Sequence, residues 1–323
     1  MVENRISVII PNYNHELFLE KRIQSVLNQS IKPFEVIILD DASTDGSCRI
    51  IDRYMDYPNV IIKKNITNSG STFAQWKKGI SIAKGELIWI AESDDFSSTI
   101  FLETLLTPFL NDSKVVISYC NHYTVDTDEK IISNVHFLSS EFSREIFESN
   151  FILDGIFFIE NYLIHKNVIP NASGVLFRKD VFQQLDEIPK SVSKMGDWLV
   201  WLQILSFGKI AFSTKKLNYF RNYDDVFYKR LTKGSHRVTI YGFELRLVYS
   251  KFLKKHNIQS KKISITNNRY ISLDIGNMGL YEIENQNIFS GLKKILKTTF
   301  WPQFKSYYIK RTFQILFNVT KGN

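Results

Sequence analysis

The stretch GELIWIAESDD (residues 85–95) joins a short apolar run to a crowded acidic end. Residues 87–91 predict a buried strand, because the run is short and is bounded by glycine on one side and by acids on the other. Glu92, Asp94 and Asp95 follow it directly. Carboxylates this close together repel one another unless a cation or hydrogen-bond donors lie among them. The stretch therefore predicts either a site for a divalent metal and a diphosphate at a strand end, or an acidic turn that caps the next helix.

The composition is that of a globular protein with anionic partners. The 323 residues are 44% hydrophobic, enough for one large domain with an appendage or for two domains. The net charge of +8 favours nucleotide phosphates, nucleic acid or acidic lipid. Cys48 and Cys120 have no metal-binding or redox spacing, which indicates a reducing compartment. With no signal-type segment at the start and no apolar run of about 20 residues, we expect a cytoplasmic protein, soluble or peripheral.

Strand-like and helix-like patterns alternate through the first part of the chain. The strand-like runs are residues 6–10, 34–39, 60–62, 87–91 and 115–119. Ser43 is a good N-cap for a helix that would continue to Met55. Such alternation predicts an α/β fold with a mostly parallel sheet and helices on both faces. Because parallel strands end at one edge, the loops at 11–14, 40–45 and 92–95 should converge on one pocket.

The last part of the chain has a different character. It is predominantly helical in pattern and basic, and no acidic residue follows Glu284. Lysines alternate there with aromatic and aliphatic residues over 289–323, as in helices that lie on anionic membranes. The same pattern also fits a helical appendage that packs on the rest of the protein, or a homodimer contact. We leave the three interpretations open.

Six motifs in order resemble one known family. They are SVIIPNYN (7–14), VIILDDASTDGS (36–47), NSG (68–70), AKGELIWIAESDD (83–95), NASGVLFRKDVF (171–182) and GDWLVWL (196–202). The set is similar to the inverting, nucleotide-sugar-dependent glycosyltransferases of family 2, which have the Rossmann-like GT-A fold. The resemblance implies a catalytic domain over 1–230, with a nucleotide-binding half (1–120) and an acceptor-binding half (121–230), followed by a helical basic region (231–323).

The resemblance also implies roles for individual residues. Those expected to bind the donor nucleotide are Pro11, Tyr13, Asn14, Asp41, Gly70, Gln75 and Asp94, with Asp41 accepting a hydrogen bond from the base. Asp95, with Asp94, would bind Mn²⁺ or Mg²⁺ at the diphosphate, and Asp197 would be the catalytic base. Ser173 and Trp198 would lie on the acceptor side. Asp41 could instead cap the helix that follows it, Asp197 could be a helix cap, the base or both, and Trp198 could be a core residue.

Three departures from the family pattern affect these expectations. Glu92 stands where aspartate is common. The loop after Gly70 lacks the Ala-Arg-Asn of many members, so Gln75 or a lysine is expected in place of a base-contacting arginine. No Gln-x-x-Arg-Trp follows Asp197, which favours transfer of one sugar per encounter over processive synthesis.

The sequence therefore predicts a metal-dependent, inverting transferase. It would move one sugar from a nucleotide diphosphate, most simply UDP, to a saccharide or a lipid-linked oligosaccharide in surface polysaccharide or lipopolysaccharide assembly. The expected place is the cytoplasm or the cytoplasmic face of the inner membrane, with no nucleic-acid partner. Two alternatives are a sugar nucleotidyltransferase, although PNYNH lacks its glycine-rich loop, and a basic binding protein with a vestigial site. The sugar, the acceptor and the linkage are not indicated.

Overall fold

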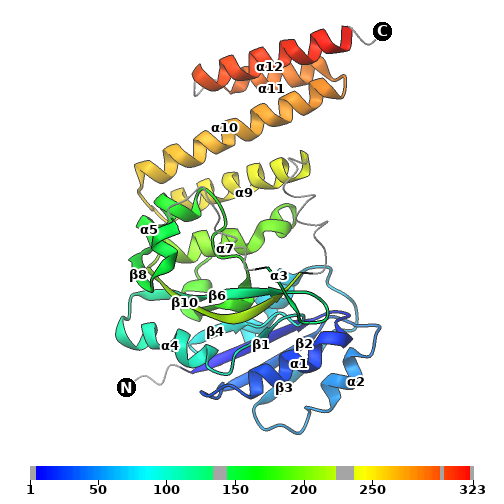
Figure 1. Ribbon diagram of the computed structural model, residues 1–323, viewed down its shortest axis with the longest axis vertical. Helices are drawn as coiled ribbons and strands as arrows, with labels where there is room; N and C mark the ends of the chain where they lie inside the picture. Colours follow the sequence, from blue (N-terminus) through cyan, green and yellow to red (C-terminus); the bar gives the residue numbers. More distant parts are fainter. Residues whose placement is uncertain (1–4, 134–143, 223–235, 299–301, 321–323) are drawn as a thin grey trace. The chain divides into compact units, whose positions relative to one another are not determined.

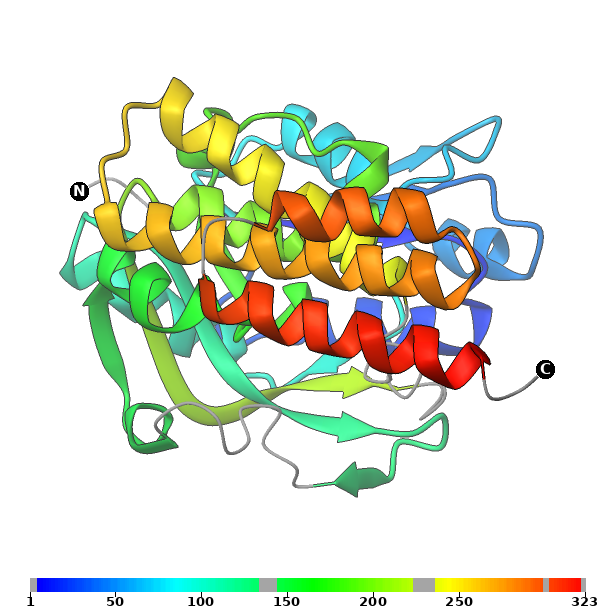
Figure 2. The same cartoon turned by 90° about the horizontal axis from the view of Figure 1, so that it is seen from above.

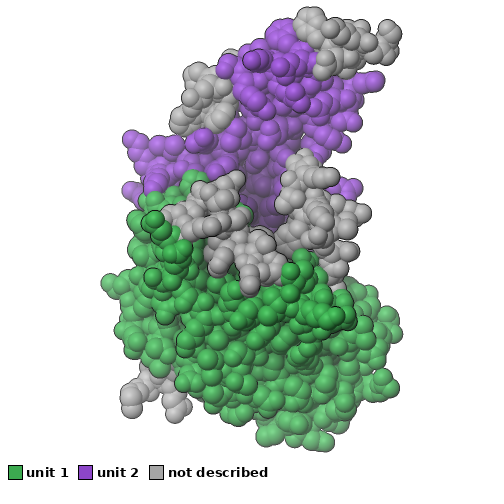
Figure 3. Space-filling view, in the orientation of Figure 1, with its two compact units in different colours: residues 1–188, 200–223 green, residues 189–199, 224–323 purple. Residues whose placement is uncertain are grey.

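The computed structural model describes residues 5–133, 144–222, 236–298 and 302–320. The chain forms two compact units, shown in Figure 3. The first contains residues 1–188 and 200–223, and the second contains residues 189–199 and 224–323. The predicted domain boundary at residue 230 lies outside the described residues. The division of the first domain into two halves stays a prediction.

The first unit begins with the predicted alternation of strands and helices (Figure 1). Its elements are β1 (Ile6–Asn12), α1 (Glu16–Leu27), β2 (Glu35–Asp40), α2 (Ser47–Asp52), β3 (Val60–Lys64), α3 (Thr72–Ile82) and β4 (Leu87–Ile90). They continue with β5 (Phe96–Ser97), α4 (Phe101–Asn111), β6 (Val115–Val125), β7 (Ile131–Ser133), η1 (Arg144–Glu148), β8 (Phe151–Asp154), α5 (Gly155–Phe158), η2 (Ile159–Leu163), η3 (Ala172–Gly174), β9 (Val175–Arg178), α6 (Lys179–Phe182) and β10 (Lys209–Arg221). The helix α7 (Gly196–Leu205) begins in the second unit and ends in the first.

One sheet connects all of these strands. Its order is β3-β2-β1-β4-β9-β6-β10-β5, with β7 paired to β6 and β8 paired to β10. The pairs β1–β2, β1–β4, β2–β3 and β6–β10 are parallel. Strand β9 runs antiparallel between β4 and β6, so β4 and β6 share one direction. The predicted α/β class with a large parallel sheet is confirmed.

The two faces of the sheet are covered by different helices. Val8 and Ile10 of β1 belong to an apolar cluster that also contains residues of α1, α2 and α4. Ile9 points to the opposite face, because side chains alternate along a strand. There α3 approaches so closely that a Cβ atom at Gly79 would lie 2.5 Å from Ile9 Cγ2. Helices on both faces, as predicted, leave the strand ends as the place for a ligand.

The predicted helix from Ser43 to Met55 is wrong at its start. The structure has α2 at Ser47–Asp52, preceded by Gly46 without a side-chain cap. The Ser43 hydroxyl instead donates to Asp40 Oδ1 at 2.6 Å and accepts from the backbone N–H of Asn14 at 3.0 Å. A partner distant in the sequence thus competes with the local capping role.

The second unit is helical. It contains η4 (Lys190–Met195), α9 (His236–Lys255), α10 (Lys261–Glu284), α11 (Ile288–Lys297) and α12 (Pro302–Thr320), and Figure 2 shows α10, α11 and α12 side by side. Glycines let α10 and α11 approach closely: a Cβ atom at Gly291 would lie 2.5 Å from the Gly279 backbone oxygen. Among the helices of the described residues, none combines the length and the apolar character needed to cross a membrane.

We expect Gly291→Ala to lower the melting temperature, because its methyl group would overlap the Gly279 carbonyl. Overpacking of this kind costs about 1–3 kcal/mol. Gly242→Ala on α9 is the matched control, since a Cβ atom there meets only Asp274 Oδ2 at 3.6 Å, and alanine is preferred to glycine in helices by roughly 1 kcal/mol. Calorimetric scans that show equal melting temperatures for both variants would contradict the close crossing.

Candidate active site

A cavity of about 370 Å³ lies where β1, β2 and β4 end. Its lining comes from the loops after these strands and from the start of α3. The lining residues are Pro11, Asn12, Tyr13, His15, Asp41, Asn68, Gly70, Ser71, Thr72, Gln75, Glu92 and Ser93. The predicted convergence of three strand-end loops is therefore confirmed. Of the expected donor-binding residues, Pro11, Tyr13, Asp41, Gly70 and Gln75 line this cavity.

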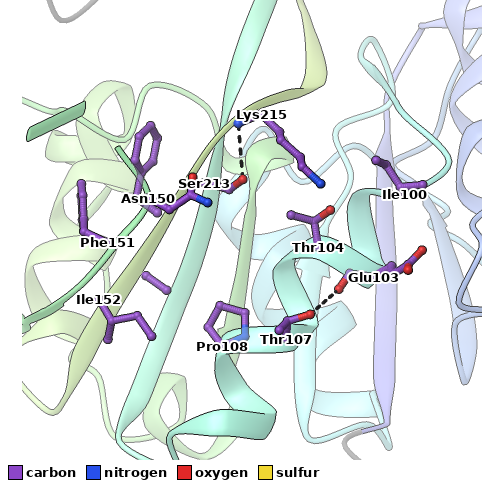
Figure 4. Close-up of a pocket in the computed structure, with 12 residues that line it drawn as sticks. Ile100, Glu103, Thr104, Thr107, Pro108, Asn150, Phe151, Ile152, Ser213 and Lys215 are labelled. Atoms are coloured by element: carbon purple, nitrogen blue, oxygen red, sulfur yellow. Dashed lines mark hydrogen bonds between the residues drawn. The ribbon is translucent and has the colours of Figure 1, made fainter. Parts of the chain in front are cut away.

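A second cavity, of about 490 Å³, lies between α4 and the strands β8 and β10 (Figure 4). Several of its polar groups already have partners within the protein. The Thr107 hydroxyl donates to the Glu103 backbone oxygen at 2.9 Å, and Ser213 Oγ accepts from the Lys215 N–H at 3.3 Å. None of the residues predicted to have a function lines it. The strand-end cavity is therefore the better candidate, although it is smaller.

Asp41, at the end of β2, is buried and its carboxylate is surrounded by donors. Asp41 Oδ1 accepts from Asn65 Nδ2 at 2.6 Å and from Gln75 Nε2 at 2.8 Å. Asp41 Oδ2 accepts from the Ser69 hydroxyl at 2.7 Å. These contacts fix the loop that begins α3, so Asp41 supports the wall of the cavity in addition to lining it.

Asn14 has a similar supporting role at the end of β1. Its backbone has a φ of 56°, in the left-handed region that asparagine tolerates. Its side-chain oxygen accepts from the Thr44 N–H at 2.8 Å, which ties the loop after β1 to the loop after β2. Asn14 is exposed and is not among the residues that line the cavity.

Two arginines hold the acidic loop after β4 through hydrogen bonds to its backbone. Arg22 of α1 donates from Nε to the Glu92 carbonyl at 2.8 Å. Arg221 at the end of β10 donates from Nε to the Asp94 carbonyl, also at 2.8 Å. Both arginines are buried. Because they bind carbonyl oxygens, they fix the loop without occupying the side chains of Glu92 and Asp94.

Asp95 points into the protein. Its Oδ2 accepts from Asn171 Nδ2 at 2.8 Å and lies 3.9 Å from Arg22 Nη2. Its Oδ1 accepts from the Arg221 N–H at 2.9 Å. Only 2% of the residue is exposed, so in this conformation its carboxylate presents no surface to a metal ion. Asp94, half-buried one position earlier, is better placed for that role.

Burial and like charge dominate the electrostatics of this loop. Desolvation, reinforced by Asp94, raises the pKa of Glu92 to about 8. Desolvation also raises the pKa of Asp95 to about 6, against the effect of Arg22. Burial lowers the pKa of Arg22 to about 10, and the neighbouring carboxylates oppose that shift. A cation at the mouth of this loop would relieve the repulsion that raises these carboxylate pKa values.

The donor set suits a metal that shares its coordination with a substrate. In the described part of the chain, no group of three or more His, Cys, Asp or Glu side chains is arranged to hold a metal ion. Mg²⁺ commonly takes one or two carboxylates together with substrate phosphates. Glu92, which lines the cavity, and Asp94, which does not, are the two side chains that would supply such oxygens. Glu92 Oε1 also accepts from Trp76 Nε1 at 2.9 Å.

The predicted acceptor-side residues have structural contacts. Ser173 is fully buried; its hydroxyl accepts from the Glu92 N–H at 3.1 Å and its carbonyl accepts from Trp89 Nε1 at 2.8 Å. This burial leaves Ser173 no surface for an acceptor and gives it a supporting role. Trp198, in the second unit, is half-buried, with the Arg246 guanidinium 5.6 Å from its ring centre. Asp197 is the second residue of α7 and is half-buried.

His15 is a site residue that the sequence did not suggest. It lines the cavity, and its Nδ1 lies 2.7 Å from Ser93 Oγ. This hydrogen bond joins the loop after β1 to the acidic loop after β4. The sequence feature that could have indicated His15 as a site residue is its position directly after the PNYN motif.

Comparison with known proteins identifies the class to which this fold and site belong. Glycosyl transferase family 2 matches residues 7–185, and the chain belongs to this family. The crystal structure of Staphylococcus aureus TarS 1–349 superposes with a TM-score of 0.59 at 15% identity, covering 99% of this chain and 92% of that one. This likeness supports the fold and confirms the predicted GT-A class.

Two curated relatives show what the matching part is similar to. Glycosyltransferase GlyG of Streptococcus pneumoniae is 36% identical over 125 residues, which are 38% of this chain and 41% of that protein. Abequosyltransferase RfbV of Salmonella typhimurium is 29% identical over 185 residues, 56% of this chain and 55% of that protein. The chain thus spans about half the length of these relatives.

The raised pKa of Glu92 predicts a change of stability with pH. Between its ordinary value of 4.5 and about 8, the folded protein holds more of this proton than the unfolded chain, so stability falls as pH rises through that window. Glu92→Gln lacks this titrating group and should not lose stability in this way. The melting temperature of the variant minus that of the parent protein should therefore increase by a few degrees between about pH 5 and pH 8. Glu148→Gln, at an exposed glutamate, is the control. Parallel pH profiles for the parent and Glu92→Gln would contradict the assignment.

Proposed function

We propose that the protein transfers one sugar from a nucleotide-diphosphate sugar to a saccharide acceptor, with inversion and with the help of a divalent metal. The main support for this proposal is the cavity at the ends of β1, β2 and β4, which has a carboxylate loop at one side. The chain in which it lies belongs to glycosyl transferase family 2. UDP is the preferred nucleotide, because solved complexes of the structurally similar TarS contain UDP and UDP-GlcNAc.

The acidic loop would bind the diphosphate end of the donor. Asp94 and Glu92 are the residues that would hold Mn²⁺ or Mg²⁺, whose positive charge stabilises a departing nucleoside diphosphate. Arg22 and Arg221 keep the loop backbone in place during this step. We assign Asp95 to positioning the loop, in place of the predicted metal contact, because its carboxylate is buried and fully engaged.

Asp197 is the residue that we propose as the base. An acceptor hydroxyl must lose its proton as it attacks the anomeric carbon, and a carboxylate within hydrogen-bond reach accepts that proton. A single displacement by the hydroxyl, with no covalent sugar–enzyme intermediate, inverts the anomeric configuration. This assignment rests on the GDWLVWL motif.

The names of the relatives support a general proposal for the acceptor class. Curated relatives include an abequosyltransferase and a poly(ribitol-phosphate) beta-glucosyltransferase. We therefore place the reaction in the assembly of a bacterial surface polysaccharide, with a free or lipid-linked saccharide as the acceptor. The match to a transferase family disfavours the sugar nucleotidyltransferase alternative.

Two substitutions separate donor binding from chemistry. Asp94→Asn should weaken Mn²⁺-dependent UDP binding by at least about tenfold, because it removes a charged metal ligand. Asp197→Asn should leave that binding nearly unchanged and lower the transfer rate by about 10²–10⁴-fold. Calorimetry with UDP and Mn²⁺, together with donor turnover, measures both. If the parent protein shows no Mn²⁺-linked UDP binding, the proposed function is refuted. If Asp197→Asn keeps full turnover, Asp197 is not the base.

We also propose that α11 contacts an anionic membrane, as one use of the basic region 289–323, of which residues 299–301 and 321–323 are outside the described structure. Phe289, Leu292 and Leu296 are exposed on α11, and Phe289 is 83% accessible. Lys293 and Lys297 are exposed beside them. An apolar strip flanked by lysines is the pattern of an interfacial helix.

Flotation with phosphatidylglycerol vesicles at low salt tests this contact. The full chain should float with these vesicles and not with phosphatidylcholine alone, and Phe289→Ser should reduce the floated fraction severalfold. Ile66→Ser is the matched control, because Ile66 is a 99% exposed isoleucine of the first unit. Failure of the full chain to float with anionic vesicles would refute the proposal and leave a packing or dimer role for this region.

A further inference from the structure

Two buried amide side chains in the cavity have a fixed orientation. Asn12 Nδ2 donates to Asp40 Oδ1 at 2.9 Å and to Ser43 Oγ at 3.2 Å. An ionised carboxylate accepts hydrogen bonds and cannot donate them, so the NH₂ group, and not the carbonyl oxygen, must face Asp40. The carbonyl oxygen, Asn12 Oδ1, therefore points away from that carboxylate.

Gln75 repeats this arrangement with the next carboxylate of the chain. Its Nε2 donates to Asp41 Oδ1 at 2.8 Å and to Ser69 Oγ at 3.0 Å. By the same reasoning, Gln75 Oε1 must point away from Asp41. The adjacent acids Asp40 and Asp41 thus hold Asn12 and Gln75, respectively, by their NH₂ groups.

Both amide oxygens lack a hydrogen-bond partner within the described part of the chain. Asn12 is 2% exposed and Gln75 is 4% exposed, and both line the strand-end cavity. An unpaired polar atom that is buried costs about 1–3 kcal/mol, and most buried polar atoms in proteins are paired. Two such acceptors, on residues that line one cavity, suit a ligand that brings two hydrogen-bond donors.

Asp41 itself is poorly suited to receive one of those donors. Its carboxylate already accepts from Asn65, Ser69 and Gln75. A base that bound Asp41 directly would have to displace one of these contacts. The Gln75 oxygen needs no such exchange, because its amide group is already oriented and its acceptor is unoccupied among the described residues.

The strand order assigns the two acceptors to different parts of a nucleotide. In the order β2-β1-β4, the acidic loop follows β4, Asn12 ends β1, and Asp41, which holds Gln75, follows β2. A nucleotide with its diphosphate at the acidic loop would then place its ribose near β1 and its base near β2. This assignment rests on the proposed function.

We propose that Gln75 Oε1 accepts the ring N–H of the donor's base and that Asn12 Oδ1 accepts a ribose hydroxyl. Asp40 and Asp41 are positioning residues that orient the two amides. Gln75 is accordingly the residue that determines base specificity. Uracil offers a ring N–H at N3, whereas cytosine has an acceptor at the same atom, so an amide oxygen favours uracil and repels cytosine.

The first experiment needs no substitution and therefore cannot fail through misfolding. Calorimetry on the full chain with Mn²⁺ compares UDP, CDP, 3-methyl-UDP, and the 2′-deoxy and 3′-deoxy forms of UDP. We expect CDP and 3-methyl-UDP to bind at least about tenfold more weakly than UDP, and one of the two deoxy forms to bind severalfold more weakly. Equal affinity for UDP and CDP would overturn the role of Gln75, and full affinity of both deoxy forms would overturn that of Asn12.

The second experiment removes the acceptor. Gln75→Met should reduce the UDP-to-CDP affinity ratio to within about twofold, mainly through weaker UDP binding. Gln29→Met is the matched control: Gln29 is also a buried glutamine, but its Nε2 donates to Ser25 and Ser98 carbonyls at 2.8 Å and its Oε1 accepts from the Leu102 N–H at 2.9 Å. The control should lower the melting temperature and keep the UDP-to-CDP ratio.

The outcomes separate the two proposals. Absence of Mn²⁺-linked binding of every nucleotide would refute the proposed function itself. If a folded Gln75→Met variant binds UDP and keeps the parent's preference for UDP over CDP, only the assignment of Gln75 is refuted. Thermal unfolding of each variant shows whether it is folded before the affinities are compared.

Discussion

The arrangement of the acidic loop depends on the buried guanidinium of Arg22. This group is fully buried beneath the loop, bonded to the Glu92 carbonyl and close to Asp95. Three carboxylates within one turn of chain would otherwise repel one another in a poorly solvated place. Arg221 makes the matching bond to the Asp94 carbonyl from the other side. Two buried arginines therefore hold the loop backbone, Arg22 offsets only part of the repulsion among its carboxylates, and Asp94 is left half-buried.

Much of the fold could be predicted because its signals are local. Apolar runs of strand length and amphipathic helical spacing determine β1 to β4 and α1 to α4, and parallel strand direction explains the shared edge. The position of β9 could not be predicted, because residues 175–178 pair with β4 and β6 through contacts distant in the sequence. Ser43 was assigned to the wrong partner in part for the same reason, since its hydroxyl accepts from the N–H of Asn14, 29 positions away, and donates to nearby Asp40.

The site shows the same division between what is local and what is not. The motifs indicate which loops meet, and the cavity confirms that meeting. What each acid does there depends on donors from elsewhere: Asn65 for Asp41, and Asn171 for Asp95. These two carboxylates are oriented inward by their partners. The lining of the cavity accordingly includes amide side chains, hydroxyl groups, His15 and Tyr13 beside these acids.

The division of the chain into units places residues 189–199 with the C-terminal helices, even though residues 200–223, which include β10, belong to the first unit. Within that second unit α9 packs against η4, and Arg246 covers the ring of Trp198. A shortened chain that ended near residue 222 would keep every family motif yet lose the support of the segment that carries Asp197. The family motifs and the compact units thus end at different residues. A transferase domain cut just after the last motif would lack the helices that pack against the segment carrying Asp197.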